Sequence, residues 1–276
     1  MSEQEAASRA ERVVDRLAVL YGDGRFPDVN IDGGENPIEI VDDEIVDWQR
    51  SYGSQDAFTC LVRTILSQNT SDVASQPAHD ALVDRYGPGG PEQDGDLAHS
   101  LAAAAQEELA ETISSAGLYN QKSTVICAVA ERIVTEYDGA SGFDTFVKES
   151  NPATVRDSLL EMKGVGPKTA DCVLLFAGGR PGVFPVDTHV HRIYRRLGIA
   201  PPDADHEDVR TVLEREVPPE KCGFGHTASI QFGREYCSAR KPACLDGPEA
   251  CPLYELCDRV GVDDVTGAVV DPAEAE

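Results

Sequence analysis

The sequence has little of several features that would point to particular classes of protein. Only six of its 276 residues are lysine, one is tryptophan and two are methionine. Its longest apolar run, around "CVLLFAG", is far shorter than the roughly 20 residues that a membrane-spanning helix needs. The opening "MSEQEAASRAERVVDRL" lacks the apolar centre of a signal peptide. We therefore expect a soluble, intracellular, cytoplasmic protein with no membrane partner.

Basic charge is scarce as well. The chain carries 24 basic and 49 acidic residues, a net charge of −25. This balance normally argues against a nucleic-acid partner, because phosphate binding relies on basic side chains. The charge is uneven, however: residues 158–245 hold 12 basic and 11 acidic side chains, and the remainder holds 12 and 38. The acidic shell predicts a halophilic chain adapted to high internal salt; the alternative is an ordinary acidic protein.

Strand-like alternation is rare, whereas helical periodicity recurs along the chain. The periodicity predicts helices over residues 5–21, 56–68, 71–87, 107–117, 121–137 and 153–162. We therefore expect an all-α fold. The turn-rich residues 22–37 predict an acidic loop, and the acidic end from Val262 predicts a frayed tail.

The stretch "RDSLLEMKGVGPKTADCVLLFAG" (156–178) is typical of two helices joined by a Gly-Val-Gly turn. Gly164 and Gly166 permit a turn whose N–H groups, with the start of the next helix, can face an anion. The pattern looks like a helix-hairpin-helix, which grips the DNA backbone through main-chain donors and needs little positive charge. The alternative is a plain tight turn. Lys168 follows this turn, either as a nucleophile or as a surface charge.

A second stretch, "VFPVDTHVHRIYRRLGI" (183–199), places Asp187 just before a helix-like run. Asp is a frequent helix N-cap. The functional alternative is a carboxylate that interacts with cationic chemistry nearby. His189 and His191 are two residues apart and would point away from each other on a helix, so we do not expect them to bind a metal.

Four of the eight cysteines are clustered, with six, six and five residues between them. Disulfides are not expected without a secretory signal, and zinc sites usually contain more closely spaced pairs. Four thiolates in one short segment instead suit a [4Fe–4S] cluster. The predicted ligands are Cys237, Cys244, Cys251 and Cys257.

Together these motifs resemble the endonuclease III family of helix-hairpin-helix DNA glycosylase/AP lyases, which carry an iron–sulfur cluster. "ILSQNTSDV" (65–73) and "AGLYNQK" (116–122) match the same family, so the resemblance covers roughly residues 56–257. It implies two helical domains with a DNA-binding cleft between them. A six-helix domain over 51–181 would contain the hairpin, and residues 182–257 would carry the cluster and pack against residues 1–50. Residues 258–276 would form a disordered acidic tail.

The resemblance also implies roles for single residues. Lys168 falls on the nucleophilic lysine, and Asp187 on the catalytic aspartate. Leu118 matches a wedge that enters the opposite strand. Other DNA contacts, in the loop that fills the hole left by an extruded base, in the hairpin and in the cluster loop, would come from Gln68, Asn69, Gly164, Val165, Gly166, Arg240 and Lys241.

The implied function is a bifunctional DNA glycosylase/AP lyase of base excision repair. Such an enzyme removes damaged pyrimidines and cleaves the 3′ side of the abasic site by β-elimination. The implied partner is double-stranded DNA containing damaged bases or abasic sites, bound by a nucleoid-associated monomer. Lys168 favours this function, because adenine- and mismatch-specific relatives lack a lysine there. The alternatives are a glycosylase of one of those types, or a non-catalytic DNA-binding iron–sulfur protein.

Two positions depart from the family pattern. The gap between Cys244 and Cys251 is six residues, where the family usually has two. Asn69 stands where several relatives have glutamine. The first departure bears on the geometry of the predicted cluster. The second bears on how the protein contacts the base that is left unpaired opposite the extruded nucleotide.

Overall fold

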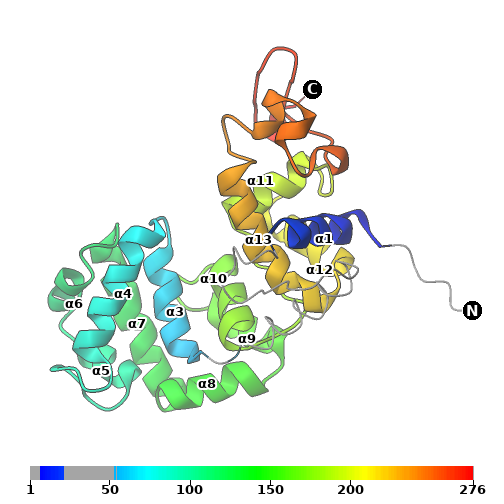
Figure 1. The fold of residues 1–276 in the computed structure, drawn as a ribbon. Helices are drawn as coiled ribbons and strands as arrows, with labels where there is room; N and C mark the ends of the chain where they lie inside the picture. Colours follow the sequence, from blue (N-terminus) through cyan, green and yellow to red (C-terminus); the bar gives the residue numbers. More distant parts are fainter. Residues whose placement is uncertain (1–6, 22–52, 54, 276) are drawn as a thin grey trace, which may run out of the picture. The chain divides into compact units, whose positions relative to one another are not determined.

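A computed structural model of the chain describes residues 7–21, 53 and 55–275. The acidic insertion at 22–48, with its expected loop, lies outside these described residues. All regular elements in the described part are helical (Figure 1), and the β-pairing there is one isolated bridge between Val262 and Val269. The all-α prediction is confirmed. No helix in this part of the chain is long and apolar enough to span a membrane.

The chain forms two compact units. We call Tyr52–Arg180 the hairpin unit, and Met1–Ser51 with Pro181–Glu276 the cysteine unit. The described helices of the hairpin unit are α3 (Ala57–Ser67), α4 (Asp72–Tyr86), α5 (Leu97–Ala103), α6 (Gln106–Thr112), α7 (Tyr119–Tyr137), α8 (Ala140–Glu149), α9 (Pro152–Leu160), α10 (Pro167–Cys172) and the π-helix η1 (Val173–Ala177).

Helix α3 forms the centre of the hairpin unit. It packs against α4, α7, α8, α10 and η1. Most of its side chains are buried, including the large Phe58, Leu61 and Ile65. A helix that is apolar on most sides is typical of a position enclosed by other helices. Asp56 begins α3 by accepting a hydrogen bond from the Thr59 N–H at 2.8 Å.

The family resemblance implies six helices in this unit, and its described residues form eight α-helices. The difference comes from short helices such as α5 and α6. The backbone is extended at Ala104 and Ala105, so a helix cannot continue through them. The helix expected over 107–117 ends at Thr112 for a similar reason, because Ile113 leaves helical geometry with ψ of 17°.

The turn 161–166 between α9 and α10 depends on one glycine. Gly164 has φ of +89°, a region that L-residues avoid. A Cβ atom there would lie 2.7 Å from both Cγ atoms of Val125 on α7. Val165 is buried and donates its N–H to the Met162 carbonyl at 3.0 Å. Gly166, with φ of −98°, has no atom within 4 Å of a Cβ placed on it.

The cysteine unit combines the first described helix with the C-terminal ones (Figure 1). Its helices are α1 (Arg9–Tyr21), α11 (Thr188–Arg196), α12 (His206–Glu216) and α13 (Cys222–Glu235), with the 3₁₀ turns η2 (Pro219–Lys221), η3 (Ala243–Asp246), η4 (Pro248–Ala250), η5 (Tyr254–Leu256) and η6 (Pro272–Glu274).

Helix α1 packs against α13 closely enough to need a glycine. A Cβ on Gly225 would lie 2.8 Å from the ring of Phe184 and 3.0 Å from a methyl of Val14. Arg9 then joins the start of α1 to the end of the chain. Its guanidinium donates to the carbonyls of Leu197 and Leu256 at 2.5 and 2.8 Å.

Residues 258–275 do not form the disordered tail that the sequence predicted. Asp258 pairs with Arg9 at 2.7 Å, and Asp271 pairs with the buried Arg195 of α11 at 2.5 Å. The Val270 N–H donates to the Gly261 carbonyl at 2.9 Å. Acidic composition favours disorder when the carboxylates lack partners. Here arginines of α1 and α11 supply those partners.

We predict that Gly164→Ala lowers the free energy of unfolding by about 2–4 kcal/mol, the combined cost of a left-handed alanine and of an overpacked contact with Val125. Gly166→Ala is the matched control, because its backbone is extended and the space around it is open. Urea unfolding of the two variants beside the wild type measures both changes. Equal loss in the two variants would contradict this account of the turn.

Candidate functional site

Lys168 is the second residue of α10 and lies directly after the hairpin turn. Its side chain is half-buried. It is one of the charges near the Cys60 thiol of α3, whose pKa burial raises to about 12. Among the described residues, no carboxylate or carbonyl forms an ion pair or hydrogen bond with the Lys168 amine. The amine is therefore half-buried and has no partner among the described side chains and carbonyls.

The other five lysines differ from Lys168. Three of them have hydrogen-bond or ion-pair partners, and these are Lys122, Lys148 and Lys221. Lys163 and Lys241 are exposed. Lys168 thus combines partial burial with a free amine, a combination that suits a reactive lysine better than a solvated surface charge.

Gln68 ends α3 and reaches the hairpin. Its side-chain amide donates to the carbonyl of Gly164 at 3.1 Å and to the hydroxyl of Thr169 at 3.0 Å. The next residue, Asn69, is exposed and has φ of +50°. The structure therefore places the predicted gap-filling loop beside the predicted DNA-gripping turn.

Leu118 is a second exposed tip in the hairpin unit. Its side chain is 53% exposed and its φ is +58°. A Cβ on the preceding Gly117 would lie 3.4 Å from the Thr70 hydroxyl and 3.9 Å from the Asn69 carbonyl oxygen. Two segments that are about fifty residues apart in the sequence thus lie side by side. The buried side chain of Val165, by contrast, leaves only its main chain for an external contact.

Asp187 is the N-cap of α11 in the cysteine unit. Its Oδ1 accepts hydrogen bonds from the N–H groups of His189 and Val190, at 2.9 and 2.8 Å. Among the described residues, its Oδ2 has no hydrogen-bond donor. The capping bonds hold the carboxylate in one orientation and leave one oxygen available to accept a proton.

The two histidines of α11 have other partners. His189 Nδ1 lies 3.1 Å from the Arg192 guanidinium, and His191 Nε2 lies 2.9 Å from the Ala204 carbonyl. Burial lowers the pKa of both. In the described part of the chain, no three Cys, His, Asp or Glu side chains form a group that could hold a single metal ion.

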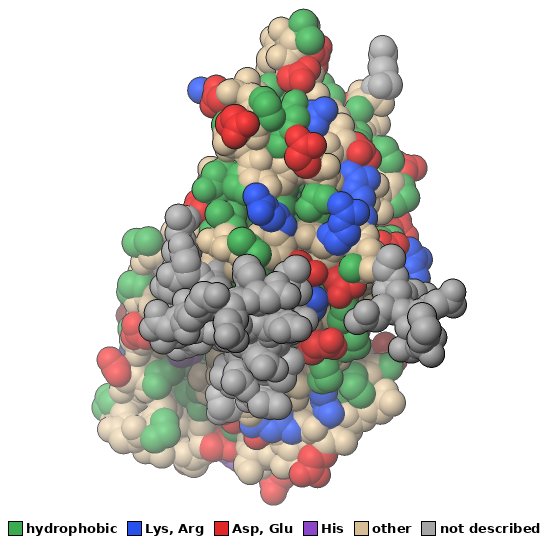
Figure 2. All heavy atoms as spheres, turned by 45° about the vertical axis from the view of Figure 1, so that its right-hand side comes forward, with side chains coloured by type: hydrophobic (Ala, Val, Ile, Leu, Met, Phe, Trp, Pro, Cys, Tyr) green, Lys and Arg blue, Asp and Glu red, His purple; other side chains and the backbone are tan. Residues whose placement is uncertain are grey.

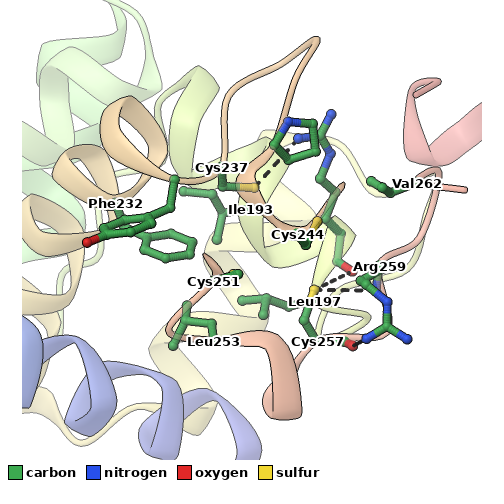
Figure 3. Close-up of a pocket in the computed structure, with 13 residues that line it drawn as sticks. Ile193, Leu197, Phe232, Cys237, Cys244, Cys251, Leu253, Cys257, Arg259 and Val262 are labelled. Carbon is green, nitrogen blue, oxygen red and sulfur yellow. Dashed lines mark hydrogen bonds between the residues drawn. The ribbon is translucent and has the colours of Figure 1, made fainter. Parts of the chain in front are cut away.

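The four clustered cysteines line one pocket of the cysteine unit (Figure 3). The cavity volume of the pocket is small, about 20 Å³. Its wall is otherwise mainly apolar, with Ile193, Leu197, Phe232 and Leu253 among the lining residues. All four cysteines are free thiols.

Ionisation of the buried thiols in this pocket is unfavourable unless a cation is nearby. Burial, together with the charges of neighbouring cysteines, raises the pKa of Cys251 to about 11 and that of Cys257 to about 12. Burial also raises the pKa of Cys244. Bound iron or zinc would stabilise the thiolates of these three cysteines, because a metal ion reverses the effect of mutual repulsion.

Buried arginines hold the cysteine loop, and sequence reasoning missed this role. Arg196 donates to the carbonyls of Ser238 and Ala239 at 2.6 and 2.7 Å and lies 3.6 Å from the Cys237 sulfur. Arg192 donates to the Cys237 carbonyl at 2.8 Å. The signal was the basic run "RIYRR", in which arginines on a buried helix need internal acceptors.

The residues added between Cys244 and Cys251 lie outside the pocket. They form η3 and η4, which are separated by Gly247 with φ of +110°. Asp246 and Glu249 are exposed. The larger gap therefore lengthens the loop outward while all four sulfurs keep facing one pocket (Figure 3).

Arg240 and Lys241 are exposed at a turn of the same loop. The Ser238 hydroxyl closes this turn: it donates to the Lys241 carbonyl at 2.6 Å and accepts from the Lys241 N–H at 3.2 Å. The structure thus presents both cations to solvent directly after the segment Cys237–Ala239, which the arginines of α11 anchor.

Comparison with known proteins identifies the family of the chain. Residues 62–219 match the model of the HhH-GPD superfamily base excision DNA repair protein. The chain is 32% identical to endonuclease III of Thermotoga maritima over 222 residues, which is 80% of this chain and 92% of that protein. It is 38% identical to endonuclease III of Bacillus subtilis over 151 residues, 55% of this chain and 62% of that protein.

Solved structures show the same fold. A trapped endonuclease III–DNA covalent intermediate superposes with a TM-score of 0.65 at 26% identity, covering 92% of this chain and 97% of that one. A thermostable thymine-DNA glycosylase has a TM-score of 0.66 at 20% identity and shares the fold. The chain therefore belongs to the endonuclease III family of helix-hairpin-helix proteins and is a base excision repair DNA glycosylase.

Proposed function

We propose that the chain is a bifunctional DNA glycosylase/AP lyase that acts on damaged pyrimidines in double-stranded DNA, as a monomer. The observation that carries the proposal is Lys168, a half-buried amine without a partner among the described residues, directly after the hairpin turn. Family membership and the likeness to a trapped endonuclease III–DNA covalent intermediate support it. A covalent intermediate requires a nucleophile of this kind.

In the proposed reaction the damaged nucleotide leaves the base stack, since its C1′ atom is unreachable within the duplex. The Lys168 nitrogen bonds to C1′, the glycosidic bond breaks, and its electrons leave with the base. Loss of the amine protons and opening of the sugar give an imine at C1′. A C2′ proton is then removed, and the 3′ phosphate leaves by β-elimination.

We assign Asp187 the role of proton acceptor and of electrostatic stabiliser for the cationic sugar. Its fixed Oδ1 and available Oδ2 suit this role. We assign main-chain contacts with the DNA backbone to Gly164, Val165 and Gly166, and phosphate contacts to the exposed Arg240 and Lys241. Gln68, Asn69 and Leu118 would occupy the space that the extruded base leaves.

We predict that Lys168→Gln abolishes strand nicking and borohydride trapping on an abasic duplex, because the amide cannot form an imine. Its affinity for that duplex should stay within several-fold of wild type. Asp187→Asn should bind DNA and lose turnover by about a hundredfold or more, as expected for a general acid–base residue. Gel-based nicking and trapping assays measure both effects.

Lys163→Gln is the matched control, because Lys163 is an exposed lysine of the same turn. It should weaken binding slightly, reduce the salt dependence of binding by about one ion, and leave trapping intact. A trapped complex formed by Lys168→Gln would show that another amine does the chemistry. In that case the assignment of Lys168 fails.

A mismatch- or adenine-type glycosylase is the competing function. Thymine glycol, 5-hydroxycytosine, abasic-site and A·8-oxoguanine duplexes separate it from the proposed one. The proposal expects cleavage and trapping with the first three substrates. Base release from the last one alone, without trapping, would favour the competing function.

We further propose that Cys237, Cys244, Cys251 and Cys257 hold a [4Fe–4S] cluster. The four thiols surround one pocket, and two sulfurs lie near N–H donors, at 3.6 Å from Arg196 and 3.3 Å from the Arg259 N–H. A single zinc ion needs all its sulfurs about 2.3 Å away, whereas a cubane takes one thiolate on each iron. When bound, the cubane would cross-link the loop that carries Arg240 and Lys241.

We predict that protein purified without oxygen is brown and contains about four iron atoms per chain. Cys251→Ser should lose iron and destabilise the loop, whereas Cys60→Ser should keep its iron, because Cys60 is buried in the hairpin unit. Iron and zinc analysis of both variants tests this. One zinc per chain with no iron would overturn the cluster assignment.

We propose that the acidic surface is an adaptation to high salt. On the face drawn in Figure 2, acidic and basic side chains are interspersed, without one large basic patch. Several arginines form hydrogen bonds within the cysteine unit, among them Arg9, Arg192, Arg195 and Arg196. Self-repulsion among the remaining carboxylates then opposes folding at low salt.

We predict that the melting temperature rises by several degrees or more between dilute buffer and molar KCl, as screening weakens this repulsion. Activity should peak at high KCl rather than at low salt. Differential scanning calorimetry across a KCl series gives the first result, and nicking rates give the second. A melting temperature that does not depend on KCl would contradict the adaptation.

A further inference from the structure

Lys122 is a buried cation that the proposed reaction does not use. It lies near the start of α7, and its side chain is 4% exposed. The ammonium donates to the Leu66 carbonyl at 2.7 Å and to the Thr70 hydroxyl at 2.6 Å. In the described part of the chain, no carboxylate forms an ion pair with it.

A lysine in this position is costly for stability alone. Taking an ammonium out of water is unfavourable unless the site compensates it, and here both acceptors are neutral. Burial lowers the pKa of Lys122 accordingly. The partial compensation is the carboxyl end of α3, where Leu66 is the penultimate residue and the helix dipole favours a cation.

The two acceptors of Lys122 flank one of the exposed tips. Leu66 precedes Gln68–Asn69, and Thr70 follows it, so the ammonium closes the loop from both sides. Lys122 also belongs to the same helical turn as the other tip, because its own N–H donates to the Leu118 carbonyl at 3.0 Å. Lys122 therefore joins the Gln68–Asn69 loop to the Leu118 tip.

Both tips hold a non-glycine residue in the left-handed region. Asn69 has φ of +50° and Leu118 has φ of +58°. Such a backbone persists only where surrounding contacts impose it. The contacts of Lys122 and the close approach of Gly117 to Thr70 contribute to this, beside the hydrogen bonds of the Gln68 amide with the hairpin and of the Thr70 hydroxyl with the Gln68 carbonyl.

We propose that Lys122 is a positioning residue that holds the Gln68–Asn69 loop and the Leu118 tip in one register, so that both enter the duplex together when the damaged nucleotide is extruded. The inference rests on the proposed function. Lys122 touches no reacting atom; it acts through the two tips. Its role is therefore needed for a duplex, where the base stack must be opened, and is not needed for single-stranded DNA.

The experiment compares Lys122→Met with wild type on an abasic site in a duplex and in a single strand. Methionine is one atom shorter than lysine, keeps most of the apolar side chain and removes the charge. We expect duplex nicking to fall on the order of tenfold to a hundredfold, as misplaced contacts commonly cost. Borohydride trapping on the single strand should stay near wild type. The fluorescence rise of 2-aminopurine placed opposite the lesion should fall in parallel with duplex nicking.

Two further variants keep the test decisive. Thr70→Val removes one acceptor and keeps the lysine, so it carries the test if Lys122→Met does not fold; with Lys122→Met it should show strong non-additivity. Lys148→Met is the matched control, because Lys148 is a half-buried lysine of the same unit that pairs with Asp144 at 2.9 Å. It should leave the duplex-to-single-strand ratio unchanged.

The outcomes are separable. Equal losses on duplex and single strand would show that Lys122 only supports the fold, and wild-type activity on both substrates would show that it supports neither tip; either result overturns the inference. If the wild type traps neither substrate, the proposed lyase function fails instead.

Discussion

A chain with a net charge of −25 that acts on DNA must approach a polyanion, and this constraint decides how its cations are used. Side-chain cations cannot supply a large attractive surface, so in the proposed function main-chain N–H groups of the hairpin turn donate to the DNA backbone. They are effective only if the turn that carries them is rigid. Gly164 makes it so, because its left-handed backbone lets the turn press against Val125 of α7. The few remaining cations can then be reserved for chemistry and positioning.

The same scarcity explains why so many basic side chains are internal. Arg196 holds the cysteine loop through two carbonyls, Arg9 fastens the first helix to the end of the chain, and Lys122 closes a loop of the hairpin unit. Each satisfies backbone acceptors that have no partner in a helix or sheet. Loss of one such cation leaves one or two backbone carbonyls without this partner, so these positions tolerate little change.

The cysteine loop shows how an insertion can be accommodated without moving a site. The longer gap before Cys251 is taken up by two 3₁₀ turns with exposed Asp246 and Glu249. Gly247, in the left-handed region and with open space around it, permits the chain to reverse between them. The sulfurs remain around one apolar pocket because the arginines of α11 hold the loop before the insertion begins.

The sequence by itself determined the all-α class, the family and the local character of the motifs. Three features depend on neighbours a few residues away: the helical periodicity, the Gly-Val-Gly turn and the Asp187 N-cap. Such short-range preferences can be predicted from the amino-acid sequence alone. The composition misled at the end of the chain, because it could not show that Asp258 and Asp271 meet arginines of distant helices. Only the tertiary structure decided that the Gln68–Asn69 loop lies beside Leu118 and that Lys122 joins them. The contacts between these two segments, which are about fifty residues apart, produce no periodic pattern in the sequence. They depend on how α3 and α7 pack.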